Sequence, residues 1–274
     1  MTRLLGLLAA LALAACATGP RGAASEPVSA ARMSRVVQVL ASDAFQGRAP
    51  ASPGEDMAVP WLIGQLSAIG VEPGGPGGQW YQTVPLVRTQ LGAGAVSAGS
   101  ARWTQARDVY LSTVRPVDRV RIAAAPMVFV GHGVTAPERG WDDFKGVDLT
   151  GKVAVFLVND PDFAARPGED AAGRFGNRRM TYYGRWTYKF EEAARRGAVA
   201  ALIVHDTPGA GYGWSTVTAP AGENYDVVRA AGDTRVALQG WIEGAAAARL
   251  FAAAGLDLEA ERVRARRAVS GRWS

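Results

Sequence analysis

Two short apolar runs constrain the fold of this chain more than any other feature. They are Lys152–Asp160 (KVAVFLVND) and Ala198–Asp206 (AVAALIVHD). Each has about the length of one buried strand, is rich in valine and is closed by an aspartate. Between them, Thr187–Arg196 predicts a helix that ends at a glycine cap, Gly197. Strand, helix and strand together predict the core of a domain.

Further elements are predicted on both sides of this core. Helices are expected at Arg32–Ala41, with Met33, Val36, Val37 and Leu40 as an apolar stripe, at Glu55–Ile69, with Trp61, Leu62, Leu66 and Ile69 as a buried face, and at Glu243–Ala254. Strands are expected at Gln79–Arg88, Asp108–Ser112, Val117–Ala123, Pro126–Gly131 and Arg235–Ile242. The low-complexity stretch Leu91–Ser100 indicates a domain boundary.

The first residues are typical of an export signal. Arg3 precedes an apolar segment, Leu4–Leu13, that is too short to span a bilayer. Leu13-Ala14-Ala15-Cys16 resembles the lipobox of bacterial lipoproteins, so we expect residues 1–16 to be a signal peptide with lipid on Cys16. Residues 17–30 would be a tether. Ala17 in place of aspartate favours the outer membrane, so we expect an envelope lipoprotein facing the periplasm.

The charge of the chain is concentrated at its C-terminal end. The formal net charge is +5 and the pI is about 9.6, yet residues 259–274 carry five arginines against two glutamates. The rest is close to neutral, which argues against a nucleic-acid partner. We expect residues 259–274 to form a basic, disordered tail.

Motifs of common catalytic sites are missing from the sequence. There is no G-x-S-x-G, and Cys16, the sole cysteine, belongs to the signal. Gly209–Gly213 is rich in glycine but is not followed by a helix-opening sequence, which disfavours dinucleotide binding. His132 and His205 lie in different segments, and we expect His205 to be structural and the backbone of His132 to matter more than its ring. We therefore predict no catalytic and no metal-binding residue.

Several polar or aromatic groups leave alternatives open. Glu191-Glu192 resembles a catalytic pair, but nearby Lys189, Arg195 and Arg196 favour ion pairing. Carboxylates in loops could hold a cation such as Ca²⁺, although turns and caps are the favoured roles; these are Asp142, Asp143, Asp160, Asp162, Glu169 and Asp170. Six aromatic residues suggest either packing, which we favour, or a surface for sugar or peptide; these are Tyr182, Tyr183, Trp186, Tyr188, Tyr212 and Trp214.

Several motifs together resemble one protein family. The segment Leu40–Arg48 (LASDAFQGR), then Ser52–Glu55 (SPGE), then Ile69–Pro73 (IGVEP), is similar to the opening of secreted zinc aminopeptidases of metallopeptidase family twenty-eight. Val128–Val134 (VFVGHGV), Gly140–Asp143 (GWDD), Gly151–Val153 (GKV) and Glu192–Ala198 (EAARRGA) are similar to their inserted protease-associated domain.

The resemblance implies an α+β chain made of two parts. Residues 31–90 would be the helical lead-in of an incomplete α/β zinc-exopeptidase domain, and residues 105–258 a β-rich protease-associated domain with flanking helices. The family binds two zinc ions through two His, two Asp and one Glu, beyond the inserted domain, and acts on peptides. This sequence stops at Ser274, before such residues, so we expect a truncated or frameshifted product without zinc and without activity of its own.

Two functions remain open. The first is the N-terminal portion of a lipid-anchored zinc-dependent exopeptidase, active when the missing part is supplied elsewhere. The second is a non-catalytic envelope lipoprotein whose protease-associated domain binds peptides or partner proteins. In both, the membrane is reached through lipid on Cys16.

Overall fold

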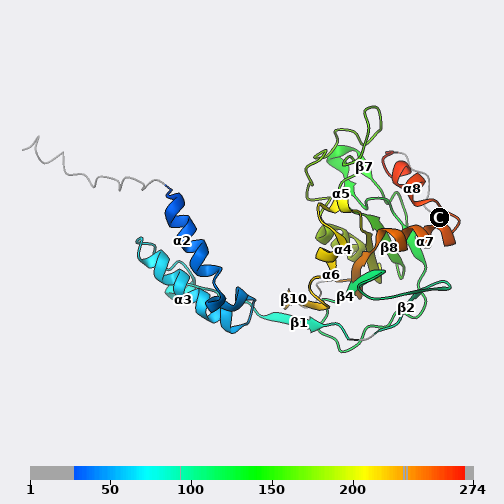
Figure 1. Ribbon diagram of the computed structural model, residues 1–274. Coiled ribbons are helices and arrows are strands. Elements are labelled where there is room, and N and C mark those ends of the chain that lie inside the picture. The colour runs from blue at the N-terminus through cyan, green and yellow to red at the C-terminus, as the bar shows by residue number, and fades with distance from the viewer. Residues whose placement is uncertain (1–27, 93, 231, 233, 269–274) are drawn as a thin grey trace, which may run out of the picture. The chain divides into compact units, whose positions relative to one another are not determined.

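The computed structural model describes residues 28–92, 94–230, 232 and 234–268. These residues form a mixed α and β structure that divides into two compact units between Thr83 and Val84 (Figure 1). Cys16 and the rest of residues 1–27 lie outside the described part. Within the described part, no helix has the length and apolarity needed to cross a bilayer.

The first unit is helical. Its elements are α2 (Ala30–Leu40), the 3-10 helix η1 (Asp43–Arg48), α3 (Pro53–Ser67) and the 3-10 helix η2 (Pro76–Gly78). The side chain of Ser29 accepts a hydrogen bond from the backbone N–H of Arg32 and so caps α2. Pro53 opens α3 at a position where a missing N–H costs nothing. The two α-helices agree with the sequence prediction to within about two residues at each end.

Few side chains of the first unit are buried. Helix α2 buries none, and α3 buries only Gly54 and Ala58. Leu62 and Leu66 are each 41% exposed, and Ile69 is 56% exposed. The prediction that the second helix has a buried face is therefore wrong within this unit. Two short helices alone do not provide a second layer of secondary structure that would cover that face.

A five-stranded sheet forms the core of the second unit. Its strands are β4 (Val109–Ser112), β5 (Met127–Phe129), β8 (Val153–Leu157), β9 (Ala200–Val204) and β11 (Leu238–Ile242), in the order β4-β11-β9-β8-β5. The strands β5, β8, β9 and β11 are parallel, and β4 runs antiparallel to β11. The two apolar runs are thus strands, β8 and β9, as their sequence predicts, and the structure places them next to each other in the sheet. The helix α4 (Trp186–Arg195) connects them.

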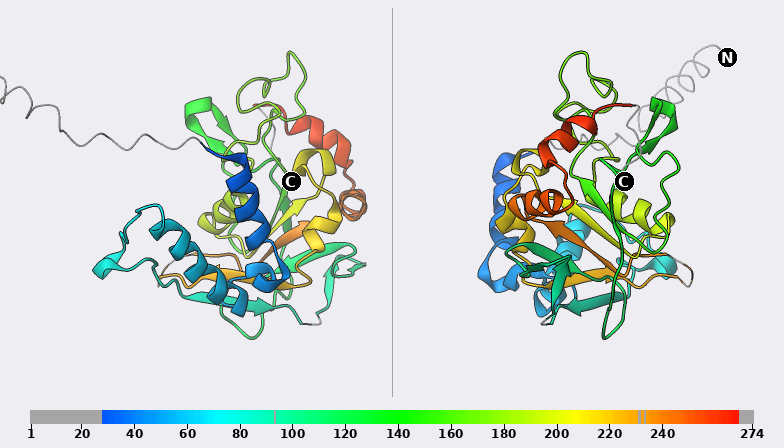
Figure 2. Two further views of the ribbon diagram at one scale, coloured as in Figure 1. Left: turned by 60° about the vertical axis from the view of Figure 1, so that its left-hand side comes forward. Right: turned by 90° about the vertical axis from the view of Figure 1, so that its right-hand side faces the viewer.

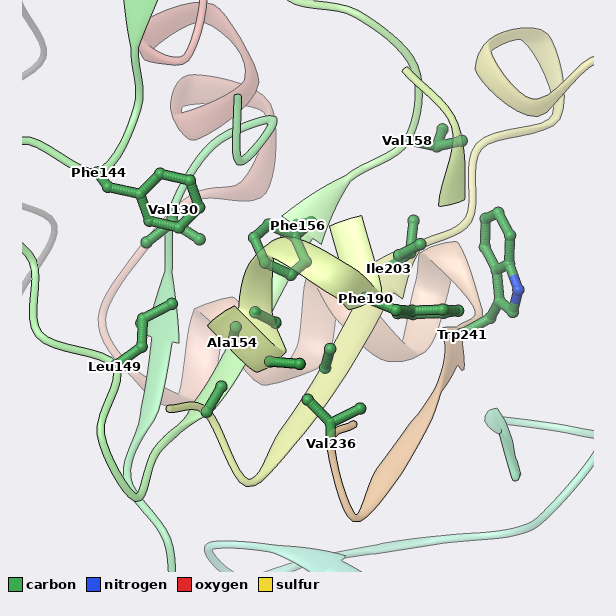
Figure 3. Close-up of a cluster of buried hydrophobic side chains, with 14 of the residues drawn as sticks. Val130, Phe144, Leu149, Ala154, Phe156, Val158, Phe190, Ile203, Val236 and Trp241 are labelled. Carbon is green, nitrogen blue, oxygen red and sulfur yellow. The ribbon is translucent and has the colours of Figure 1, made fainter. Parts of the chain in front are cut away.

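Alternate residues of the central strands serve the two faces of the sheet. Phe156 and Ile203 contribute to one buried cluster, together with Phe190 of α4 (Figure 3). Leu157 and Val204 contribute to the other. Because side chains alternate along a strand, a continuous apolar run fills both faces at once. This explains why neither run shows an alternating pattern.

Different helices cover the two faces. The first face is packed by α4 and by α6 (Trp214–Thr218), which follows the short helix α5 (Thr207–Ala210). The second face is packed by α7 (Gly244–Ala253), α8 (Leu258–Arg264) and the hairpin β2–β3 (Val96–Ala98 and Ala101–Trp103). Figure 2 shows α7 and α8 next to each other, in orange and red.

A two-stranded antiparallel sheet includes the first strand of the second unit. Strand β1 (Leu86–Gln90) pairs with β10 (Glu223–Val227), more than a hundred residues later. This pairing ties residues 86–90 to the second unit, whereas the sequence assigned them to the lead-in. The sequence predicts a strand at Gln79–Arg88, but in the structure the strand β1 begins only at Leu86, directly after Pro85. The prediction of a strand at Val117–Ala123 is wrong, because these residues pair with no neighbouring strand in the structure.

The C-terminal helix α8 corrects a second prediction. Residues 259–268 were expected in a disordered tail, yet Leu258–Arg264 is helical. The Asp257 side chain accepts a hydrogen bond from Ala260 N, and the helix has acidic residues in its first turn and arginines in its last. Ala265 is buried, close to Gly131 in the turn that follows β5. The prediction of a disordered tail relied on charge composition alone, which does not reveal helix caps or packing. Residues 269–274 lie outside the described part.

The remaining elements form a small layer beside the sheet. They are β6 (Thr135–Ala136), the 3-10 helix η3 (Pro137–Arg139) and β7 (Trp141–Asp142). Trp141 is buried, and its ring meets the edge of Phe175 at a centroid distance of 5.8 Å. This layer holds in place the loop that follows β5.

Candidate functional site

Polar residues gather at the carboxyl edge of the parallel strands, and three of them, His132, Asp160 and His205, were singled out in the sequence. His132 follows β5, Asp160 follows β8, His205 and Asp206 follow β9, and Glu243 follows β11. Parallel strands end at the same edge, and loops at that edge commonly form ligand sites. The signal in the sequence is a polar residue directly after each apolar run.

Lys189 of α4 reaches the loops at this edge with its Nζ and is fully buried. Its Nζ donates to the carbonyl oxygens of His132 (2.6 Å) and Asn159 (3.1 Å), with Tyr183 O at 3.4 Å. Burial lowers the pKa of Lys189 to about 8, against the attraction of Asp160 and Asp143. The ammonium therefore connects the loops after β5 and β8 with the segment that precedes α4.

The sequence did not identify Lys189 as a buried group. From the sequence, this lysine was interpreted only as a nearby charge partner of Glu191-Glu192. The available signal was helical spacing, because Lys189 lies one turn before Ala193, which is fully buried. A lysine on the apolar side of a helix next to two strands indicates a buried donor.

His132 contributes both its backbone and its ring. Its Nδ1 lies 3.0 Å from Asn159 O, and since a carbonyl only accepts, this nitrogen carries the proton. Burial, followed by the nearby Lys189 charge, lowers the pKa of His132 to about 3, so the ring is neutral. A Cβ at Gly133 would lie 2.3 Å from Phe156, so glycine is required beside this histidine.

The carboxylates in the loops close to this edge accept hydrogen bonds from neighbouring loop residues. Asp143 accepts hydrogen bonds from Val134 N and from Trp141 Nε1, both at 2.9 Å. Burial raises the pKa of Asp143 to about 7. Asp160 accepts from the backbone N–H and the hydroxyl of Thr181, and burial raises its pKa as well.

The remaining carboxylates of the predicted calcium alternative have similar roles. Asp142 accepts from Phe144 N, and Asp162 from Phe175 N and Asn177 N. Glu169 accepts from Arg166 N, and Asp170 from Ala268 N. Across the residues that the structure describes, no group of three His, Cys, Asp or Glu side chains is placed to hold a metal ion.

The glutamate pair on α4 is engaged in ion pairs. Glu192 is largely buried and binds Arg195 at 2.8 Å and Arg196 at 2.7 Å. Glu191 lies 3.5 Å from Arg235. The guanidinium of Arg196 lies 3.7 Å from the ring centroid of Phe144 and also donates to Thr135 Oγ1. The pair thus joins α4 to neighbouring loops.

The six aromatic residues separate into different clusters. Tyr182, Tyr183 and Tyr188 meet edge to face, and the hydroxyl of Tyr188 accepts from Thr135 N. Trp186 instead meets Phe190. The structure does not bring the six together on one surface.

Tyr212 and Trp214 surround His205. The histidine is 5% exposed, and its Nε2 lies 3.1 Å from the carbonyl oxygen of Tyr212. The rings of Tyr212, Trp214 and Trp241 lie between 5.5 and 6.1 Å from the imidazole, centroid to centroid. His205 also lines a cavity of about 470 Å³ beside Asp206, Glu243 and Arg262.

Comparisons with known proteins give little further guidance. No protein-family model matches the chain. No curated protein matches it either. Among solved structures, an aminopeptidase from Aneurinibacillus sp. strain AM-1 is similar, with 18% sequence identity and a TM-score of 0.25. The match covers 77% of this chain and 45% of that chain, so this chain spans less than half the length of the aminopeptidase.

Proposed function

We propose that this chain is the N-terminal portion of a lipid-anchored, zinc-dependent exopeptidase of aminopeptidase type. In this proposal, residues 31–90 include the lead-in of the catalytic domain, and the sheet of the second unit belongs to a protease-associated domain. Zinc ligands and the general base come from polypeptide beyond Ser274 or from another chain. The lipid on Cys16 holds the assembly in the envelope.

One observation carries this proposal. The helical unit before Val84 leaves large apolar side chains in contact with solvent, notably Met33 (57% exposed) and Val37 (63% exposed) on α2. Leu62, Leu66 and Ile69 are also exposed, and apolar side chains gathered on a surface mark sites of interaction with other polypeptide. A lead-in that packs on the sheet of a catalytic domain accounts for such a face, and the motifs that resemble the opening of the family, from Leu40 to Pro73, lie in these helices and the loops beside them.

The test is complementation. The polypeptide encoded directly downstream is co-expressed with this chain, and the purified sample is measured for bound zinc and for hydrolysis of a leucine-chromophore substrate. We expect the pair to co-purify, to hold about two zinc ions and to show turnover that a chelator abolishes. The chain alone should show neither. Zinc-dependent turnover by the chain alone, or no association with a downstream metallopeptidase domain, would contradict the proposal.

A second candidate is a non-catalytic envelope lipoprotein that binds peptides or partner proteins. The cavity at the carboxyl ends of β9 and β11 favours it, because this is where open parallel sheets bind ligands. The two candidates differ in the complementation test, since the second needs no partner with zinc ligands.

A further inference from the structure

One short segment of the second unit exposes aromatic and basic side chains together. Between residues 118 and 224, the large apolar side chains that are exposed are those of Tyr182 (60%) and Trp186 (45%). The same segment, which leads into α4, carries three exposed arginines: Arg178, Arg179 and Arg185. We call residues 178–186 the basic aromatic segment.

The positive charge of this segment is not compensated by nearby side chains. Across the residues that the structure describes, none of its three arginines forms an ion pair with a carboxylate. The guanidinium carbon of Arg178 lies 6.0 Å from the ring centroid of Phe163, which carries no charge. The sequence from Ala171 to Phe190 contains no aspartate and no glutamate. The segment therefore attracts anionic groups from outside the chain.

The carboxylates that contact the segment hold it in place. Thr181 donates from its backbone N–H and its hydroxyl to the fully buried Asp160. Tyr183 Oη donates to Glu138 at 2.8 Å. A Cβ at Gly184 would lie 3.0 Å from Asp160 Oδ1, so the backbone approaches that carboxylate closely. These contacts fix the backbone between the exposed side chains.

The two exposed rings are themselves held by buried rings of α4. Tyr182 meets Tyr188 edge to face at a centroid distance of 5.2 Å, and Trp186 meets Phe190 at 5.9 Å. Tyr188 and Phe190 are buried. Rings that are fixed in advance lose little conformational freedom when a partner covers them. The segment thus presents rigid aromatic surface next to unpaired guanidinium groups.

We propose that the basic aromatic segment binds an acidic stretch of another polypeptide. Aspartate and glutamate side chains of the partner pair with the three arginines, because a planar guanidinium binds a carboxylate through two parallel hydrogen bonds. Tyr182 and Trp186 cover the apolar parts of the partner. Tryptophan, tyrosine and arginine are also the residues that dominate the energetics of protein–protein interfaces.

An anionic membrane fits this surface less well. Helices and loops that bind membranes insert a continuous apolar face, rich in large side chains such as leucine and phenylalanine. The basic aromatic segment exposes two amphipathic rings and no large aliphatic side chain. The proposal concerns the second unit and goes beyond the proposed peptidase function, because it requires neither zinc nor the helical unit.

The test measures the binding of two defined peptides to the full chain by fluorescence anisotropy. One is fluorescein-labelled Gly-Asp-Glu-Leu-Asp-Glu-Gly-amide, and the other carries Asn and Gln in place of Asp and Glu. We expect the acidic peptide to bind saturably and its amide counterpart to bind at least about tenfold more weakly. Raising the salt concentration from about 20 mM to about 200 mM should weaken binding of the acidic peptide several-fold.

Charge-neutral variants decide whether this segment is responsible. The triple variant Arg178→Gln, Arg179→Gln and Arg185→Gln should weaken binding by about tenfold or more. The matched control removes the same charge from exposed arginines of other segments and should change binding less than about twofold; its substitutions are Arg102→Gln, Arg119→Gln and Arg121→Gln. Unchanged Tm values establish that the variants fold.

Substitutions of Tyr182 test the aromatic part of the surface. Tyr182→Ala should weaken binding by about threefold or more, whereas Tyr182→Phe keeps the ring and should bind as the wild type does. Equal affinities of the two variants would contradict a contact through the ring.

Vesicles of phosphatidylglycerol and phosphatidylcholine separate a polypeptide partner from a membrane. Every protein in this arm carries Cys16→Ala, so that acyl groups do not contribute. Vesicle binding that the triple arginine variant abolishes, without binding of the acidic peptide, identifies a membrane surface and overturns the proposal. Peptide binding that the triple variant leaves unchanged, or no saturable binding below about 1 mM, overturns it as well. None of these results bears on the zinc complementation test.

Discussion

The Nζ atom of Lys189 lies 2.6 Å from the carbonyl oxygen of His132, with no carboxylate within ion-pair distance among the residues described. A buried cation is thus held by backbone carbonyls from two loops at the carboxyl edge of the sheet. Asp143 and Asp160 favour the charge from farther away. This arrangement makes the edge sensitive both to the loss of one donor and to pH.

Lys189→Met tests the role of this donor. Methionine fills a similar volume, but the carbonyl of His132 loses its partner, while Asn159 O keeps the His132 ring. We expect a loss of about 2 kcal/mol in the free energy of unfolding, measured with urea. Lys152→Met, on a partly exposed lysine, should cost less than about 0.5 kcal/mol.

The same variant should change the response to alkaline pH. The folded pKa of Lys189, about 8, lies below its ordinary value of 10.5, so between these values the unfolded chain binds the extra proton. Stability from this group therefore rises with pH across that window. Lys189→Met should remove the rise, and an identical alkaline slope in both proteins would contradict the assignment.

His132→Asn should flatten the acid side of the stability profile. The folded pKa of His132, about 3, lies below the ordinary 6.5, so the unfolded chain takes up a proton first as pH falls. The wild type should lose about 1.4 kcal/mol per pH unit through this group below pH 6.5. Asparagine can keep the hydrogen bond to Asn159 O but does not titrate. We expect urea titrations between about pH 4 and 7 to show a smaller loss on acidification in the variant.

Asp143 acts in the opposite direction over part of this window. Its folded pKa, about 7, lies above 3.8, so the folded chain holds the proton across that range and stability from this group falls as pH rises. The comparison must therefore be made between variant and wild type at each pH. Parallel profiles for the wild type and His132→Asn would contradict a neutral, buried His132.

The strands and helix of the core are predicted from the sequence better than the site is. The apolar runs of β8 and β9 and the cap at Gly197 are local patterns, and local patterns fix strands and helices. Lys189 was missed because its environment is created by loops from His132 and Asn159, far away in sequence. The pairing of β1 with β10 was missed for the same reason. Helix α8 was missed because its arginines were interpreted by charge and not by position relative to Asp257.

Gly240→Ala tests the close approach of β11 and β4. A Cβ at Gly240 would lie 2.0 Å from the carbonyl oxygen of Tyr110 and 2.9 Å from Leu111 Cα, both backbone atoms that cannot rotate away. We expect a destabilisation of about 3 kcal/mol by urea unfolding. Gly92→Ala, where a Cβ meets nothing within 4 Å, should stay within about 0.5 kcal/mol of wild type. A similar free energy of unfolding for both variants would mean that β4 and β11 can move apart without loss of stability.

Cys16→Ala tests the lipid anchor predicted from the sequence. The cysteine lies outside the described residues, and its acylation would supply the long apolar group that holds the chain on a membrane. We expect labelled palmitate to enter the wild type and not the variant, and the variant to appear in the soluble fraction. Equal labelling of both proteins would contradict lipidation at this position.

Limited proteolysis should distinguish the two units. Helices α2 and α3 bury almost no apolar side chain, whereas both faces of the central sheet in the second unit are covered. Local opening is easiest where few apolar contacts are lost, so the first cuts should fall between residues 28 and 83. Mass spectrometry should then find a resistant fragment that begins near Val84 and retains α8. A partner that covers Met33, Val37 and Leu66 should slow these cuts, and the variant Val37→Asp should remove that protection without changing the resistant fragment. First cuts within the sheet, or equal resistance of both units in the isolated chain, would contradict a helical unit that depends on a partner.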